Sequence, residues 1–328
     1  MISMTRLLNL GFALLCASCA ARPGGKGPQP TATQGKWHIH YSKVSLPDEL
    51  FGLSGIGQAG GTFWAVGERQ RQLAILRVDE TRLELERRTP LQGVPDGLDT
   101  EGLAVIEAGE GLGAAPDGAR GPVFVFATEA HTPERASDAL LLAAPSGSGV
   151  TVFDRLALPY SLWGGFRAER NGGIEGLCTL AANNAGAELV AAVETVGKHA
   201  GRRFAPVARY QAGKQRWHGY RLWLTTSRGK LSSVACRRSS RGGVEMLAIE
   251  RDDGIARLLA FSLPTATDTV QNIEPEVVVD LESYARHWIN LEGIGWLNSG
   301  ALFLLADNHS NGRLTGPTEA LILRPDAL

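Results

Sequence analysis

Ile174-Glu175-Gly176-Leu177-Cys178 opens the stretch that decides the fold, and Leu189-Val190-Ala191-Ala192-Val193-Glu194 closes it. Both segments are apolar, and a polar, Gly-containing turn joins them, which is typical of a β-hairpin. In an antiparallel hairpin the start of the first strand lies beside the end of the second strand. Glu175 and Glu194 are therefore expected at the same edge of the hairpin.

The same pattern occurs five times along the chain. The other openings are residues 53–57, 100–104, 232–236 and 291–295, and the other closings are residues 63–68, 123–129, 246–250 and 302–307. Repeated antiparallel units without a convincing helical period predict an all-β fold, a single β-propeller of five blades or six. If there is a sixth, degenerate blade, it is expected within residues 262–290. Strands near residues 37–41 and 319–323 are expected to share a blade and close the ring.

Acidic residues recur at the ends of these predicted strands. The eight acids expected to converge on the propeller axis are Glu68, Glu101, Glu129, Glu175, Glu194, Glu250, Glu292 and Asp307. The chain has 33 basic and 34 acidic residues, so this is a local excess. Two carboxylates ~5 Å apart repel by roughly 3 kcal/mol at an effective dielectric constant of about 20. Such a ring requires bound cations, raised pKa values or inserted basic side chains.

Oxygen-only ligands favour a hard cation, Ca²⁺ before another hard divalent ion such as Mg²⁺. The eight acids are therefore candidate metal ligands, with Glu101, Glu175 and Glu292 first. The alternative is that each acid only caps backbone N–H groups at a strand end. Arg69 and Arg251 directly follow closing acids, and either side chain could neutralise the acids or bind an anionic group of a substrate. His309 is a third candidate substrate contact.

Small residues recur three positions after each opening, and two of them are Cys178 and Cys236. Small side chains suit inner strands that crowd around an axis. The two cysteines are interpreted as small apolar fillers. Their matching places also allow a disulfide in an oxidising compartment, but matching places need not lie within bonding reach.

The N-terminal residues 1–19 resemble an export signal, because Arg6 precedes an apolar core at residues 7–17 that is too short to span a bilayer. Cys16-Ala17-Ser18-Cys19 resembles a bacterial lipobox with Cys19 as the lipidated residue, although Cys16 replaces the usual Leu. Cleavage near Ala20 is the alternative. Residues 20–34 are rich in Gly and Pro and predict a flexible linker. The propeller domain is expected over residues 35–328.

Several catalytic signatures are absent from the sequence. There is no G-x-S-x-G nucleophile elbow, P-loop or H-E-x-x-H motif, and no paired C-x-x-C zinc arrangement. The chain also lacks the basic stripe of a nucleic-acid-binding protein. We expect a monomer that does not bind nucleic acid and that reaches a membrane only through a lipid anchor.

The recurrent Glu-Gly-Leu/Ile step and the strand-ending acids resemble the phytase-like family, also called "esterase-like activity of phytase". The resemblance covers roughly residues 48–325 and lies in residues 52–55 with 67–69, 99–103, 173–177, 248–251 and 290–294 with 305–308. It implies a β-propeller that bacteria often export, here to the periplasm or to the outer membrane by a lipid anchor. The R-H-G-x-R-x-P and D-D-P-A signatures of known phytases are missing, which argues against true phytase activity.

Two functions are compatible with these features. The first is a metal-dependent hydrolase of phosphate or carboxylic esters, in which the acids hold Ca²⁺ or another hard divalent ion. The second is a non-catalytic envelope protein, a rigid platform with structural Ca²⁺ that binds a protein or a glycan.

Overall fold

The chain divides into two units, Met1–Gln34 and Gly35–Leu328. The computed structural model describes residues 37–42, 52–68, 70–78, 82–107, 112, 121–183, 186–239, 243–281, 290–307, 309–310, 313–314 and 320–325, all in the second unit. For residues 37–42, 181–183, 309–310, 313–314 and 325 the description covers the backbone only. The predicted signal and linker, with Cys19, lie outside the described residues.

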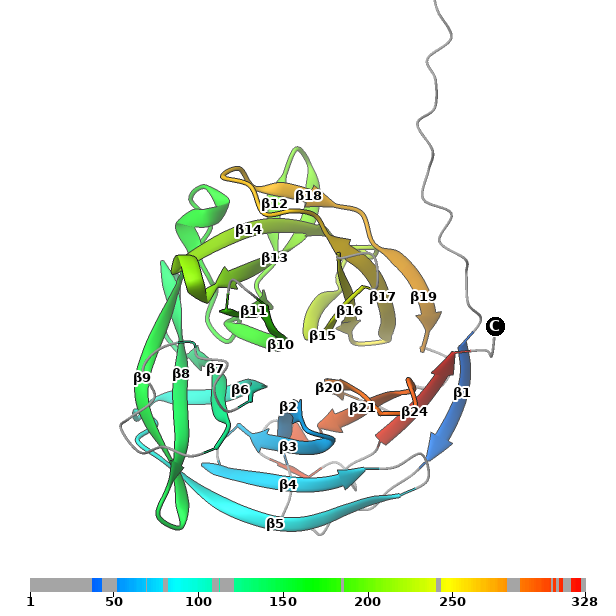
Figure 1. Ribbon diagram of the computed structural model, residues 1–328. Helices are drawn as coiled ribbons and strands as arrows, with labels where there is room; N and C mark the ends of the chain where they lie inside the picture. Colours follow the sequence, from blue (N-terminus) through cyan, green and yellow to red (C-terminus); the bar gives the residue numbers. More distant parts are fainter. Residues whose placement is uncertain are drawn as a thin grey trace, which may run out of the picture. The chain divides into compact units, whose positions relative to one another are not determined.

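The described strands form antiparallel groups of four, here called blades (Figure 1). Blade 1 contains β2 (Leu53–Ala59), β3 (Thr62–Gly67), β4 (Gln72–Val78) and β5 (Leu83–Gln92). Blade 2 contains β6 (Leu98–Ile106), β7 (Val123–Ala130), β8 (Ser137–Ser146) and β9 (Gly149–Pro159). Blade 3 contains β10 (Ile174–Asn183), β11 (Gly186–Val193), β13 (Arg202–Gln211) and β14 (Arg216–Trp223). Blade 4 contains β15 (Lys230–Arg238), β16 (Val244–Asp252), β17 (Ile255–Leu263) and β19 (Glu276–Asp280).

Blade 5 is built from both ends of the domain. Its strands are β20 (Asn290–Trp296), β21 (Leu302–Asp307), β24 (Ala320–Pro325) and β1 (Trp37–Ser42). The N-terminal strand β1 pairs antiparallel with β24, from Trp37 opposite Pro325 to Ser42 opposite Ala320. This pairing confirms the predicted shared blade, and the arrangement confirms the all-β propeller prediction.

The remaining described elements are short. They are β12 (Gly197–His199), β18 (Gln271–Ile273), β22 (His309–Ser310), β23 (Arg313–Leu314) and the 3₁₀ helices η1 (Tyr160–Trp163) and η2 (Ala212–Lys214). In the region considered for a sixth blade, β18 pairs with β14 of blade 3 and β19 pairs with β17 of blade 4. The described part of that region thus extends existing sheets. None of the helices in the described ranges is long and apolar enough to cross a membrane.

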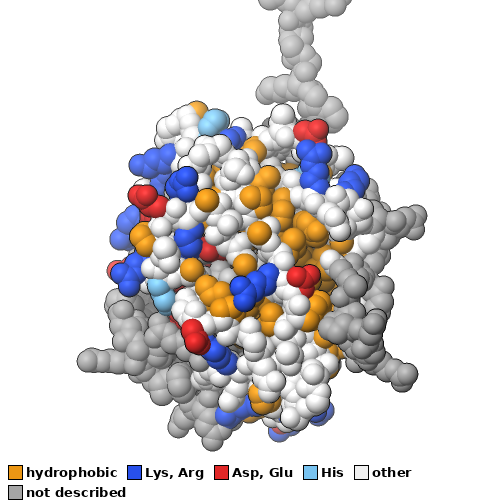
Figure 2. Space-filling view, turned by 90° about the vertical axis from the view of Figure 1, so that its left-hand side faces the viewer, with side chains coloured by type: hydrophobic (Ala, Val, Ile, Leu, Met, Phe, Trp, Pro, Cys, Tyr) orange, Lys and Arg blue, Asp and Glu red, His pale blue; other side chains and the backbone are white. Residues whose placement is uncertain are grey.

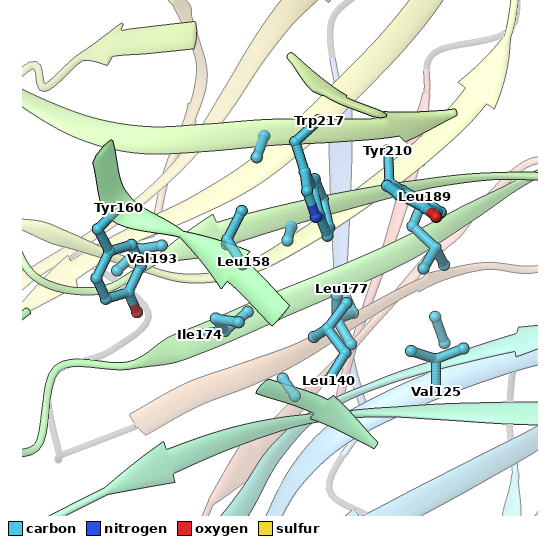
Figure 3. Close-up of a cluster of buried hydrophobic side chains, with 14 of the residues drawn as sticks. Val125, Leu140, Leu158, Tyr160, Ile174, Leu177, Leu189, Val193, Tyr210 and Trp217 are labelled. Atoms are coloured by element: carbon cyan, nitrogen blue, oxygen red, sulfur yellow. The ribbon is translucent and has the colours of Figure 1, made fainter. Parts of the chain in front are cut away.

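A hydrophobic cluster fills each contact between successive blades. Figure 3 shows the cluster between blades 2 and 3, where Leu140 and Leu158 face Ile174 and Leu189. Corresponding clusters lie between blades 3 and 4, 4 and 5, and 1 and 2. A further cluster packs Phe63 of blade 1 edge-on against Phe303 of blade 5, with ring centroids 5.8 Å apart. Because blade 5 packs on blade 1, the ring is closed.

The inner strands of neighbouring blades approach each other closely, and this explains the recurrent glycine. A Cβ atom on Gly102 of β6 would lie 2.5 Å from the carbonyl oxygen of Glu175 in the next blade. A Cβ on Gly176 of β10 would lie 2.9 Å from the backbone nitrogen of Val234. Real Cβ atoms do not approach backbone so closely. The glycine of the motif is therefore required by contact between blades.

We expect Gly55→Ala to destabilise the protein by about 3 kcal/mol, the upper end of the usual cost of overpacking. The added Cβ would overlap the carbonyl oxygen of Glu101 and lie 2.7 Å from the backbone nitrogen of Leu103. Gly243→Ala is the matched control, because no heavy atom lies within 4 Å of the Cβ position there. Denaturant unfolding measures both variants, and equal stability of the two would contradict this packing argument.

The side of the unit shown in Figure 2 carries basic and acidic side chains interspersed with apolar ones. Figure 1 shows the inner strands β2, β6, β10, β15 and β20 around the centre. The end of the ring at which these five strands begin is called the mouth.

Candidate functional site

The structure brings the eight predicted acids into the interior of the fold. Seven of them are between 0% and 7% exposed, and Glu68 is half-buried. The seven are Glu101, Glu129, Glu175, Glu194, Glu250, Glu292 and Asp307. Carboxylates are rarely so buried unless they are paired or bind a cation. Their burial therefore requires a specific compensation for each.

A β-bulge positions the opening acid of each inner strand. The register with the neighbouring strand shifts between Ile174 and Gly176 around Glu175, between Leu291 and Gly293 around Glu292, and between Thr100 and Leu103 around Glu101. A bulged residue is not paired in the ladder, and its side chain is re-aimed. Bulges at the start of the inner strands thus give Glu101, Glu175 and Glu292 the same place in three blades.

Serine occupies the bulge in the other two blades. The Ser54 hydroxyl donates to the carbonyl oxygen of Thr100 in blade 2 at 2.9 Å, and the Ser232 hydroxyl donates to that of Leu291 in blade 5 at 2.6 Å. Blades 1 and 4 therefore use this position to bind the next blade. The sequence pattern aligned Ser233 with the acids, and this was off by one residue, because the register shift lies between Leu231 and Ser233.

That offset explains the disulfide between Cys178 of β10 and Cys236 of β15. In each inner strand, the second residue after the bulge faces the preceding blade, as Leu177 and Val234 do. The third residue after the bulge faces the following blade, as Ala235 does. The structural equivalent of Cys178 is thus Ala235. Cys236 lies one residue further and points back toward blade 3, so the two sulfur atoms meet. Of the two possibilities that the sequence left open for these cysteines, the structure shows the disulfide.

The first acid group contains Glu68, Glu292 and Asp307, from blades 1 and 5. One carboxylate oxygen of each lies within 4.8 Å of the others. Glu292 Oε1 accepts hydrogen bonds from Arg251 Nη2 and Asn290 Nδ2, both at 2.6 Å, whereas Glu292 Oε2 is buried without a hydrogen-bond partner. Burial raises the pKa of Glu292 to about 8, with the Arg251 guanidinium opposing this shift and Asp307 adding to it.

The second acid group contains Glu129, Glu175 and Glu194, from blades 2 and 3, again with one oxygen of each within 4.8 Å of the others. The backbone N–H of Gly173 donates to Glu129 Oε1 at 2.9 Å, and Lys230 forms an ion pair with Glu194. Burial raises the pKa of Glu129 to about 7. Burial, followed by repulsion from Glu194, raises the pKa of Glu175 well above its usual value.

Glu101 belongs to neither group and lies within electrostatic reach of both. Burial raises its pKa well above the usual value, and the charges of Glu175, Glu68 and Glu292 raise it further. No described residue donates a hydrogen bond to the carboxyl group of Glu101 or of Glu175. Each of these largely buried carboxyl groups can therefore be compensated by a proton, a water molecule or a cation.

Glu250 points away from the other acids. Its carboxylate accepts hydrogen bonds from the backbone N–H and the hydroxyl of Thr225, at 3.1 and 2.5 Å, and from those of Thr226, at 3.0 and 2.6 Å. Four donors satisfy the buried charge fully. The observed role of Glu250 is therefore the capping of backbone N–H groups at the strand end.

Blade 4 brings positive charge to the mouth. Arg251 Nη2 lies 2.6 Å from Glu292 Oε1 and 3.8 Å from Glu194 Oε1. Arg251 was predicted from its place after a closing acid, but Lys230, Asn290 and the Gly173 N–H were not. One sequence feature could have pointed to Lys230. The fourth repeat has Ser-Ser where three other repeats have Glu-Gly, so it lacks an acid there and differs from them in charge. Arg69 lies outside the described residues, and only the backbone of His309 is described, in β22.

Beyond the acids the axis is narrow. A cavity of about 90 Å³ lies among the five inner strands and is lined by small residues that include Gly57, Ala104, Cys178, Ala235 and Gly295. This cavity is large enough to hold water molecules.

The fold and this site define a β-propeller whose mouth contains buried acid clusters of the kind that can bind a metal ion. The family model "Phytase-like: Esterase-like activity of phytase" matches residues 49–310, and the chain belongs to this family. No curated protein matches the chain.

Two solved structures show the same fold. An exo-β-1,3-galactanase from Phanerochaete chrysosporium matches with a TM-score of 0.51 at 12% identity, over 88% of this chain and 64% of that one. The endo-arabinase from Bacteroides thetaiotaomicron matches with a TM-score of 0.51 at 11% identity, over 88% of this chain and 98% of that one. This chain thus spans less than two thirds of the galactanase. Likeness at such low identity concerns the fold alone.

Proposed function

We propose that the mouth is a hydrolytic site for phosphate or carboxylic esters that works with a bound hard divalent cation, Ca²⁺ before any other. The observation that carries this proposal is the pair of largely buried carboxylates that lack hydrogen-bond donors in part or in full. Glu292 Oε2 is buried and unpartnered, and Glu175 accepts no hydrogen bond from a described residue. Both acids belong to groups of three whose oxygens are close enough to share one ion.

The chemistry of the donors fits a hard cation. The six residues of the two acid groups offer carboxylate oxygens only, with no sulfur or imidazole nitrogen. Ca²⁺ takes six to eight oxygen ligands in flexible geometry, and three carboxylates supply between three and six of them, the remainder being water. Zn²⁺ and Cu²⁺ sites ordinarily include His or Cys.

The bound ion would supply Lewis acidity, which polarises an ester oxygen and lowers the pKa of a water molecule. Glu101 would supply the acid of the reaction. Burial raises its pKa well above the usual value, which favours the protonated carboxyl that can give a proton to the oxygen of the leaving group. Arg251 holds Glu292 in place and would attract an anionic group of the substrate to the mouth.

We also propose that the protein works outside the cytoplasm, in the periplasm or on the outer membrane through a lipid on Cys19, as a monomer. Support comes from the Cys178–Cys236 disulfide, because such bonds persist in oxidising compartments. Mass spectrometry of the protein purified from membranes tests this. An N-terminal acylated Cys19 is expected, and a chain that keeps residues 1–19 contradicts it.

The hydrolase proposal is tested by assaying the purified protein on p-nitrophenyl phosphate and p-nitrophenyl acetate, with Ca²⁺ and with EGTA. We expect turnover of at least one ester with Ca²⁺, its loss in EGTA and its return when Ca²⁺ is restored. Turnover that is unchanged by EGTA contradicts a catalytic role of Ca²⁺. No turnover with any metal contradicts hydrolysis and favours the non-catalytic platform.

Without ions, the protein is expected to lose stability as the pH rises. The pKa of Glu129 is raised from 4.5 to about 7 and that of Glu292 from 4.5 to about 8. The folded protein therefore binds more protons than the unfolded chain between about pH 4.5 and 8, and its stability falls across this window. We expect a lower Tm at pH 9 than at pH 6 in EGTA, and a larger rise on adding Ca²⁺ at pH 9. A larger rise at pH 6 would contradict binding to these carboxylates.

A further inference from the structure

The two acid groups of the mouth lie in different places around the ring. The first group spans blades 5 and 1, and the second spans blades 2 and 3. Blade 4, which lies between blades 3 and 5, contributes no acid to either group. It contributes Arg251, whose side chain is 17% exposed. The mouth is therefore divided by one largely buried cationic side chain.

Arg251 contacts both groups through one nitrogen atom. Its Nη2 lies 2.6 Å from Glu292 Oε1 of the first group and 3.8 Å from Glu194 Oε1 of the second. A divalent cation placed between those two oxygens would meet the guanidinium at close range, and like charges repel strongly in a desolvated site. One shared ion at the centre is thus disfavoured, whereas an ion held among the oxygens of one group would lie to one side of Arg251.

Each group also retains a carboxylate without a donor. In the first group, Arg251 and Asn290 both bind Glu292 Oε1 and leave Oε2 buried and unpartnered. In the second group, Glu175 is 7% exposed and accepts no hydrogen bond from the described residues, although its oxygens are not fully buried as Glu292 Oε2 is. A buried acceptor without a donor costs free energy unless a ligand compensates for it. Each group therefore contains a largely buried carboxylate that a cation could compensate.

We propose that the mouth binds two hard divalent cations at once, one in each acid group, with Arg251 between them. This inference rests on the proposed function only in placing an ion at the mouth, and it adds a second, separate site. Glu101 of blade 2, which belongs to neither group, lies within electrostatic reach of both.

The test is equilibrium dialysis of the full chain against Ca²⁺ alone, with the bound metal counted by mass spectrometry. We expect two ions for each wild-type chain, one for Glu175→Gln, one for Glu292→Gln and none for the double variant. Asp253→Asn changes an exposed acid on the β16–β17 turn and should keep two ions. Circular dichroism confirms that each variant is folded, and the wild-type count does not depend on any variant.

Each outcome has a distinct meaning. One ion in the wild-type chain overturns the second site and leaves the proposed function standing. No ion overturns both. If Glu175→Gln and Glu292→Gln, each folded, both lose all bound Ca²⁺, the two groups form a single site and the inference is wrong.

Discussion

Glu101→Gln is expected to lower the rate of ester hydrolysis by about 10²–10⁴-fold, the usual contribution of a general acid. Glu101 is 5% exposed, and its carboxyl group accepts no hydrogen bond from the described residues, so the amide should fit without loss of a partner. Glu101 also belongs to neither acid group, so Ca²⁺ binding should be kept. The measurement is kcat with saturating Ca²⁺, together with the amount of ion bound.

A pH profile distinguishes a proton donor from a residue that only supports the site. With Glu101 present, activity should fall as the pH rises through the raised pKa of this carboxyl group, and the variant should lack this limb. Asp253→Asn serves as the control and should match the wild type in rate and profile. A Glu101→Gln protein with wild-type kcat, or one that no longer binds Ca²⁺, would contradict the assignment.

Removal of the disulfide should cost about 4 kcal/mol of stability. Cys178 and Cys236 are 58 residues apart, and the loop-closure model gives this value for a loop of that length. The bond also joins the inner strands of blades 3 and 4, whose contact lies next to the second acid group. Denaturant unfolding of the oxidised wild type and of the Cys178→Ser, Cys236→Ser double variant gives the difference.

Reductant provides the internal control for this prediction. Dithiothreitol should lower the stability of the wild type toward that of the double variant and should not change the double variant. If the oxidised wild type and the double variant had equal free energies of unfolding, the crosslink would not constrain the unfolded chain.

The repeat made the ring and its acids predictable. A Glu beside a Gly, followed later by an apolar run ending in an acid, located the hairpins because strand ends of an antiparallel pair share an edge. The pattern did not reveal the bulges at Glu101, Glu175 and Glu292, although a Gly inside a strand often marks one. It also could not assign rotamers, and thus could not tell that Glu250 turns to Thr225 and Thr226.

Contacts between blades were the least predictable feature. Lys230 reaches Glu194 from a different blade, and no local spacing connects the two residues. The disulfide depended on a one-residue offset in blade 4, where Ser232 and Ser233 replace Glu and Gly and weaken the alignment of the repeat. Such contacts depend on the direction in which each inner strand faces, and this is fixed by the register shift.

The antiparallel pairing of β1 with β24 has a consequence for the order of folding. Strand β1 comes first from the ribosome, yet its only described neighbour in the sheet is made of residues 320–325. Blades 1–4 can form while synthesis proceeds, but β1 cannot pair in its sheet until β24 has been synthesised. A ribosome that stalls before residue 320 would therefore release an open horseshoe with an unpaired edge, the kind of species that aggregates and is removed by proteases.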